Sequence, residues 1–168
     1  MLLLISVSGF NGTDLFVGGW FSFSVPIGGA LIFGNIARWN GTSWFAMGTG
    51  MNDWLNAVTT LPNGDLVAGG YFTFAGQSTC NRIARWNGTN WSPMGTGMND
   101  SVQALIVMPN GDLVAGGQFT TAGGVPANYV ARWNGTSWAA MGSGLSGIVM
   151  TLASLPNGDI VAGGAGIA

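Results

Sequence analysis

The chain of 168 residues contains no histidine, no lysine and no glutamate, and only 6% of its residues are charged. Helices commonly place lysine and glutamate on their solvent-facing side, so this shortage disfavours helices. Zinc and copper sites built from histidine and cysteine are excluded, because Cys80 is the single cysteine. Calcium held by aspartates and backbone carbonyls stays open, although no EF-hand spacing occurs. We predict no metal site and no cofactor.

The same shortage leaves few groups that could perform catalysis. Proton transfer would depend on the aspartates or on Tyr71 and Tyr129. A thiolate at Cys80 would have no histidine partner to activate it. The sequence therefore predicts a protein that is not an enzyme and has no catalytic residue.

Basic clusters and long apolar runs are also lacking. The formal net charge is −2, with four arginines spread along the chain, so no electrostatic footprint for nucleic acid is present. No uninterrupted apolar segment is long enough to span a bilayer, and no polybasic segment would flank one. We expect neither nucleic acid nor a membrane as a partner. One cysteine forms no intrachain disulfide, which leaves the redox compartment open.

Among the features that the sequence does contain, a repeat of 47 residues is the dominant one. Three separate phrases recur with this same period, and each occurs three times. Ala-Arg-Trp-Asn-Gly-Thr begins at Ala37, Ala84 and Ala131; Trp-x-x-Met-Gly-x-Gly begins at Trp44, Trp91 and Trp138; Pro-Asn-Gly-Asp begins at Pro62, Pro109 and Pro156. We divide the chain, as one domain 1–168, into units of about 1–52, 53–99 and 100–147 and a half unit 148–168.

Each full unit predicts four short strands. In the second unit they are expected at residues 57–61, 66–72, 82–86 and 91–94, with a loop of variable sequence between the second and the third. Asn-Gly pairs separate the first strand from the second and the third from the fourth. Both residues tolerate positive φ, so we expect type I′ hairpin turns. The unit is then a four-stranded antiparallel meander.

Such a sheet is apolar on both faces and must be covered on both sides. Radial stacking of the sheets achieves this cover, and a period of this length with four strands is typical of propeller blades. The predicted fold class is all-β, a β-propeller made of four-stranded antiparallel blades with about three and a half blades per chain. A β-solenoid is the alternative, although its rungs would be shorter and its strands parallel.

The phrases at 62–70 and 83–89 carry a family resemblance. They look like repeats of bacterial kelch-like propellers, and they also resemble the strand-turn-strand rhythm of WD-repeat blades. The resemblance implies a propeller and a secreted or cell-surface location. It implies no particular activity, because propellers include enzymes, lectins and scaffolds.

Aspartate and arginine occur in equal numbers in the units. In a chain so poor in charge, this balance indicates structural ion pairs within or between blades, with a ring of charges around a ligand as the alternative. The predicted pairs are Asp14 with Arg38, Asp65 with Arg85, and Asp112 with Arg132.

The loops between successive units supply the candidate ligand-binding residues. Six of the eight tryptophans follow the repeat and are expected to pack between blades, whereas Trp20 and Trp54 do not follow it. Polar side chains beside Trp54 would suit a sugar, although any polar loop contains such residues. The predicted ligand-binding residues are Asn52, Asp53, Trp54, Asn99 and Asp100.

The half unit 148–168 supplies the functional hypothesis. Propellers need roughly four to eight blades, so three and a half do not close a ring. We expect a non-enzymatic module that self-associates to complete a propeller ring, most simply as a homodimer with eight blade positions. A fragment of a longer propeller is one alternative. The other is a lectin-like module that binds carbohydrate through the variable-loop face.

Overall fold

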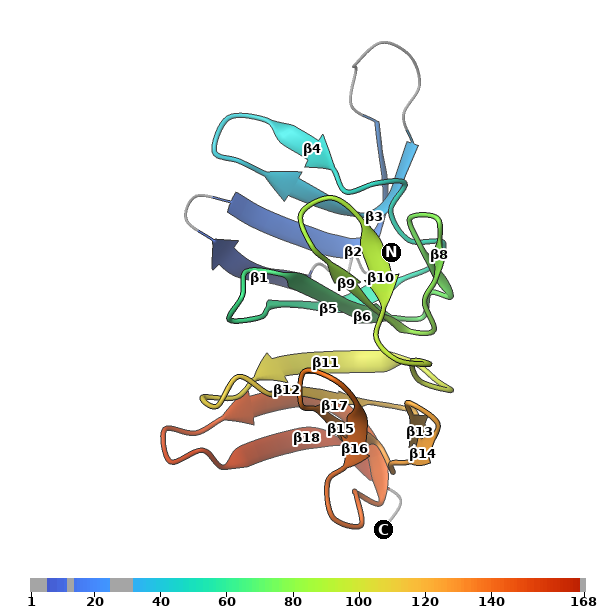
Figure 1. The fold of residues 1–168 in the computed structure, drawn as a ribbon, viewed down its shortest axis with the longest axis vertical. Coiled ribbons are helices and arrows are strands. Elements are labelled where there is room, and N and C mark those ends of the chain that lie inside the picture. Colours follow the sequence, from blue (N-terminus) through green and yellow to red (C-terminus); the bar gives the residue numbers. More distant parts are fainter. Residues whose placement is uncertain (1–5, 12–13, 25–31, 167–168) are drawn as a thin grey trace.

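The computed structural model describes residues 6–11, 14–24 and 32–166, and every regular element among them is a β-strand (Figure 1). The all-β prediction is therefore confirmed. Within these residues no helix is long and apolar enough to cross a membrane.

Three antiparallel sheets of four strands, here blades 1 to 3, follow one another along the chain. Blade 4 is a sheet of two strands. The strands of blade 1 are β1 (Ser6–Asn11), β2 (Asp14–Ser24), β3 (Ile32–Trp39) and β4 (Trp44–Ala46); those of blade 2 are β5 (Leu55–Thr60), β6 (Leu66–Gly70), β9 (Ile83–Trp86) and β10 (Trp91–Pro93). Those of blade 3 are β11 (Val102–Val107), β12 (Leu113–Gly117), β15 (Val130–Trp133) and β16 (Trp138–Ala140); those of blade 4 are β17 (Gly147–Ser154) and β18 (Ile160–Gly166).

The variable loop between the second and third strands contains a small hairpin that the sequence did not predict. In blade 2 it is β7 (Phe74–Ala75) with β8 (Ser78–Thr79), and in blade 3 it is β13 (Thr121–Ala122) with β14 (Val125–Pro126). The third strand of blade 2 begins at Ile83, not at Arg82, because Arg82 has a φ of 65° that ends the extended conformation.

The prediction of type I′ turns is wrong. Among the described residues only Asn35, Arg82 and Tyr129 have positive φ without being glycine, so Asn63 does not supply the first residue of such a turn. Instead Gly64 alone has positive φ, of 89°, and its N–H donates to the carbonyl of Leu61 at 2.9 Å. Pro62 fixes a negative φ at the start of the turn, which favours a type I turn followed by a left-handed glycine.

Successive blades approach closely along their inner strands. The first strand of each blade lies beside the first strand of the next, from β1 through β5 and β11 to β17 (Figure 1). A Cβ atom placed on Gly69 would lie 2.5 Å from Cγ1 of Val102, and one on Gly116 would lie 2.4 Å from Cγ1 of Val149. Only glycine allows this approach, because any side chain would displace the inner strand of the next blade.

A tryptophan hydrogen bond joins the outer parts of successive blades. Nε1 of Trp91 in β10 donates to the carbonyl of Met47 at 2.8 Å, and Nε1 of Trp138 in β16 donates to the carbonyl of Met94 at 2.9 Å. Both indoles are buried, so the bond is shielded from water. Each fourth-strand tryptophan is thereby fixed to the preceding blade.

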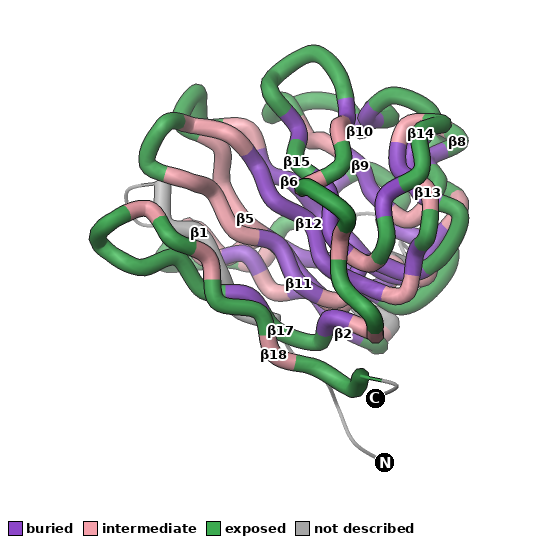
Figure 2. The backbone as a smooth tube through the Cα atoms, turned by 90° about the horizontal axis from the view of Figure 1, so that it is seen from below, coloured by how far each residue is buried: buried purple, intermediate pink, exposed green. Residues whose placement is uncertain are grey.

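The core lies between the blades. Every residue of β6 and β12 is buried, and Phe72 and Phe119, just beyond these strands, have no exposed surface. In contrast most of β17 and β18 is exposed, as the green segments in Figure 2 show. Blades 1 and 4 lie at the two ends of the array, which is open within the described residues (Figure 1).

Cys80 belongs to the core of blade 2 and has no exposed surface. Burial raises the pKa of its thiol above the ordinary value, and a hydrogen bond with the backbone of Ala75 partly offsets this effect. The equivalent residue of the next unit, Ala127, is buried as well. The thiol therefore occupies a place that a small apolar side chain also fills.

We predict that Trp91→Phe lowers the free energy of unfolding by about 1–3 kcal/mol, because the buried Met47 carbonyl loses its indole donor. Urea unfolding followed by circular dichroism measures the change. Trp54→Phe is the control, because Trp54 is 42% exposed; its substitution should change the free energy by about 0.5 kcal/mol or less. Equal losses in the two variants would contradict the role of the indole bond.

For Cys80 we predict that thiol reagents react slowly with the folded protein and fast after unfolding. The folded state holds the thiol proton more tightly than the unfolded chain, so the contribution of this group to stability is constant below the ordinary pKa of 9.0 and is lost as the pH rises above it. Urea unfolding across the alkaline range should show a steeper decline for the wild type than for Cys80→Ala. Parallel declines would show that the thiol pKa is not raised.

Candidate functional site

The predicted ligand-binding asparagines tie one loop to another within the fold. Oδ1 of Asn52 accepts hydrogen bonds from the backbone N–H groups of Thr73 and Phe74, both at 2.9 Å, and its Nδ2 donates to Oγ1 of Thr73 at 3.0 Å. Asn99 makes the same contacts one blade later, with Thr120 and Thr121. The amides of both residues therefore bind the loop that leads into the small hairpin.

The predicted aspartates bind their own chain as well. Oδ1 of Asp53 accepts the N–H of Trp54 at 2.7 Å, and Oδ1 of Asp100 accepts the N–H of Ser101 at 2.6 Å. Among the described residues no hydrogen bond joins the group at Asn52, Asp53 and Trp54 to the group at Asn99 and Asp100. The structure therefore places the five residues as two equivalent groups on successive blades.

Trp54 forms a surface with an aromatic residue of another blade. Its ring stacks on Trp20 of β2, with centroids 4.9 Å apart and planes 29° apart, and meets the edge of Tyr71 at 6.0 Å. Trp20 is 52% exposed and Trp54 is 42% exposed. We call Trp20, Trp54 and Tyr71 the aromatic platform. It lies where blades 1 and 2 meet.

Two glutamines of blade 3 bind the platform. The hydroxyl of Tyr71 accepts hydrogen bonds from Nε2 of Gln103 at 3.1 Å and from Nε2 of Gln118 at 3.2 Å. The guanidinium of Arg82 donates to the carbonyl of Tyr71. This arrangement offers flat apolar faces beside neutral amides, so it suits an uncharged ring-shaped ligand better than proton transfer.

Sequence reasoning did not connect Tyr71, Gln103 and Gln118 with this site. A signal is visible after alignment of the units, because the residue that follows the Gly-Gly pair changes from Trp20 to Tyr71 to Gln118. The surrounding phrases hardly change, so this position differs in chemistry from blade to blade within a constant frame.

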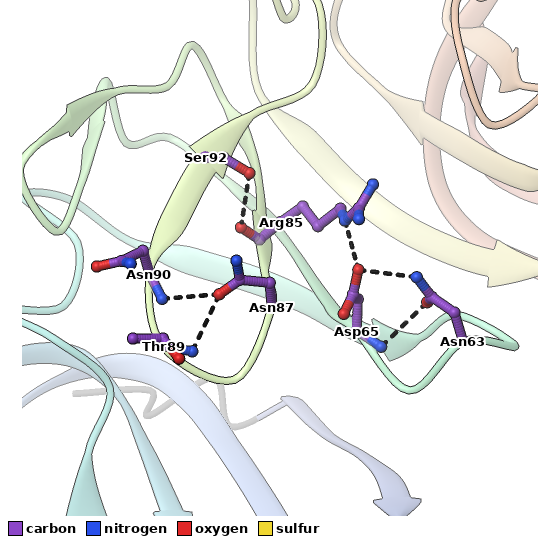
Figure 3. Close-up of polar contacts among 7 residues, drawn as sticks. All are labelled: Asn63, Asp65, Arg85, Asn87, Thr89, Asn90 and Ser92. Atoms are coloured by element: carbon purple, nitrogen blue, oxygen red, sulfur yellow. Dashed lines mark hydrogen bonds and ion pairs between the residues drawn. The ribbon is translucent and has the colours of Figure 1, made fainter.

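In each of the three predicted ion pairs the aspartate and the arginine lie close together. Each pair lies at the end of its blade that carries the tight turns. Nε of Arg85 lies 2.5 Å from Oδ2 of Asp65 (Figure 3), whereas Arg38 lies 3.6 Å from Asp14 and Arg132 lies 3.6 Å from Asp112. Asn63 also donates to Oδ2 of Asp65, at 2.9 Å. The arginine side chains are 37–50% exposed, so solvent screening keeps each contribution to stability modest.

The asparagines of the Trp-Asn-Gly-Thr turns act locally. Oδ1 of Asn87 accepts the N–H groups of Thr89 and Asn90 (Figure 3), and Asn40 and Asn134 make the same turn in the other blades. Among the described residues no three aspartate or cysteine side chains gather as metal ligands would.

Comparison with known proteins shows that part of the chain is similar to one protein family. The model of the family described as a domain of unknown function (DUF5122) β-propeller matches residues 61–93 and 109–135. No curated protein matches the chain significantly. The β-propeller part of the predicted fold and resemblance is confirmed, whereas the kelch-like or WD-like assignment stays a prediction. The two matched segments, which contain strands β6–β10 and β12–β15 of blades 2 and 3, are similar to the DUF5122 β-propeller domain.

Proposed function

We propose that this chain is a non-enzymatic β-propeller module that associates with a second copy of itself through blade 4. The observation that supports this proposal is a difference in burial between nearly identical strands. Leu-Val-Ala-Gly-Gly is wholly buried in β6 and in β12, whereas Ile-Val-Ala-Gly-Gly in β18 is half-buried or exposed. Val161 is 50% exposed, and its equivalents Val67 and Val114 are not exposed at all.

The exposed face of blade 4 corresponds to the face that packs on the next blade elsewhere. At Gly69 and Gly116 this face receives a valine from the inner strand of the following blade. At Gly163 a Cβ atom would meet only Thr151 of its own sheet. Met150, Leu155 and Val161 are 42–55% exposed nearby. Burial of one such side chain contributes about 1.5–3 kcal/mol, so covering this face is strongly favourable.

The occupant that fits this face is a further blade of the same repeat, and blade 1 of a second copy presents one. Trp44 of blade 1 is half-buried, whereas its equivalents Trp91 and Trp138 are buried against a preceding blade. A head-to-tail contact between blade 4 of one copy and blade 1 of the next, made twice around a central axis, closes a dimeric ring. The lack of histidine, lysine and glutamate supports the non-enzymatic part of the proposal.

Light scattering on the purified chain tests the association. We predict a mass of twice 17.2 kDa at high protein concentration. Val161→Asp should give the monomer mass, because it places a charge in the buried contact. Val125→Asp is the matched control, because Val125 is 38% exposed on the small hairpin of blade 3 and should leave the dimer intact. A monomer at all concentrations, or equal dissociation by both variants, would rule out this contact.

The aromatic platform supports carbohydrate binding as a second candidate function. The exposed rings of Trp20 and Trp54 offer apolar faces of the size of a sugar ring, and the amides of Gln103 and Gln118 lie beside Tyr71. Stacking together with neutral hydrogen-bonding groups is the combination that a pyranose needs.

Tryptophan fluorescence measures this binding. We predict that at least one neutral oligosaccharide in a panel changes the emission in a saturable way and that Trp54→Ala weakens its binding at least tenfold. Phe74→Ala is the control, because Phe74 is an aromatic residue that is 46% exposed outside the platform. The absence of saturable change across the panel, or equal losses in the two variants, refutes the sugar site.

A further inference from the structure

A cavity of about 390 Å³ opens where blade 1 meets blade 2, and no residue of the aromatic platform lines it. Three connections form its walls: the loop that follows β4, the turn of the small hairpin between β7 and β8, and the turn between β9 and β10. Sites for small molecules commonly measure about 300–1,000 Å³. The cavity, which we call the inter-blade cavity, is therefore large enough for a small ring-shaped ligand.

The apolar wall of the inter-blade cavity is a tilted pair of tryptophans. Trp86 and Trp91 have ring centroids 5.3 Å apart and planes 50° apart; Trp91 is buried, whereas Trp86 is only half-buried. Two glycines with positive φ, Gly48 and Gly76, lie against this pair. A Cβ on Gly48 would lie 3.8 Å from Cζ3 of Trp86, and one on Gly76 would lie 3.3 Å from Cδ1 of Trp91. Because neither residue carries a side chain, the space beside the rings stays open.

Hydrogen bonds within the chain hold the shape of the cavity. Oγ1 of Thr49 in blade 1 donates to the carbonyl of Gly76 in blade 2 at 3.0 Å, and the N–H of Gly76 donates to the carbonyl of Gly50 at 2.7 Å. Oγ of Ser78 donates to the carbonyl of Trp91 at 3.0 Å. These bonds join the two blades without a ligand, so a ligand would enter a site that is already formed.

Three other polar side chains of the lining have no such task. They belong to Gln77, Thr89 and Asn90. The backbone N–H groups of Thr89 and Asn90 donate to Oδ1 of Asn87 at 3.0 and 2.9 Å (Figure 3), but the side chains of all three residues make no hydrogen bond with another described residue. Two amides and one hydroxyl are therefore available to a ligand.

The fold itself does not require these amides. In the next unit Gly124 stands at the position of Gln77, and Ser137 stands at the position of Asn90. The small hairpin β13–β14 forms there all the same, and the N–H of Ser137 donates to Oδ1 of Asn134 at 2.9 Å. Both amides are thus particular to the second unit, where they line the cavity.

We propose that the inter-blade cavity binds a neutral pyranose. One face of the sugar ring stacks on Trp86, because C–H groups of a pyranose pack well on an indole. The amides of Gln77 and Asn90 donate to and accept from the sugar hydroxyls, since each amide carries both kinds of group. No charged residue lines the cavity, so an ionic ligand would find no counter-charge there. This site is separate from the aromatic platform and does not depend on the association of two copies.

A nuclear magnetic resonance titration of the intact ¹⁵N-labelled chain tests the site residue by residue. The probes are the methyl glycosides of glucose, galactose, mannose and N-acetylglucosamine, with cyclohexanol as a ring that carries a single hydroxyl. We expect at least one glycoside to shift the side-chain amide signals of Gln77 and Asn90 and the indole N–H signal of Trp86 in a saturable way. The indole signal of Trp54 reports on the platform separately.

The variant with both Gln77→Gly and Asn90→Ser removes the two amides and installs the residues of the next unit. We expect it to weaken binding of that glycoside about tenfold or more, because two hydrogen bonds to the sugar are lost. Ser137→Asn is the matched control, since it places an amide at the equivalent position of blade 3, outside the cavity, and should leave the affinity unchanged. The dispersion of the indole signals verifies that both variants are folded.

Three results would overturn the proposal: no saturable shift at Gln77, Asn90 and Trp86 with any glycoside, equal affinity of the double variant and the wild type, or equal binding of cyclohexanol. Saturable shifts at Trp54 without shifts at Gln77 and Asn90 would refute the inter-blade site and support the platform. Shifts at Gln77 and Asn90 without shifts at Trp54 would do the opposite.

Discussion

The close approach of each second strand to the inner strand of the next blade is the constraint on which the rest of the structure depends. Gly69 and Gly116 leave room for Val102 and Val149, and no other residue would. The indole bonds to Met47 and Met94 fix the outer parts of the same blades. Two contacts at opposite ends of a sheet set both the spacing and the rotation of the next blade.

Because these contacts run between blades, the burial of a strand depends more on whether a neighbouring blade covers it than on the sequence of the strand itself. β18 has nearly the sequence of β6 and β12, yet its residues are half-buried or exposed, and within the described part of the chain it pairs only with β17. Among the described residues no inner strand of a further blade covers the face of blade 4. The proposed contact with a second copy supplies the cover that the other blades receive from their neighbours.

The period of the phrases was sufficient to predict the sheets and which aspartate faces which arginine, because both follow from register. The turn type could not be predicted in this way. Pro62 fixes a negative φ before Asn63, and in the turns without proline the side chain of Asn87 accepts backbone N–H groups while Gly88 alone takes positive φ. The platform was missed in part because Tyr71 meets glutamines 32 and 47 residues away. The side-chain amides of Asn52 and Asn99 bind other loops of the same chain. No local sequence pattern distinguishes an asparagine with this structural role from one that binds a ligand.

Amide hydrogen exchange at several protein concentrations tests most directly whether β18 awaits a partner. The amides of Leu66–Gly70 and Leu113–Gly117 should be protected at every concentration, because both strands are paired and buried within the chain. The amides of residues 160–164 should exchange quickly in dilute solution and become protected as the concentration rises. Equal and constant protection of all three segments would contradict the account, because it would mean that β18 needs no cover from another molecule.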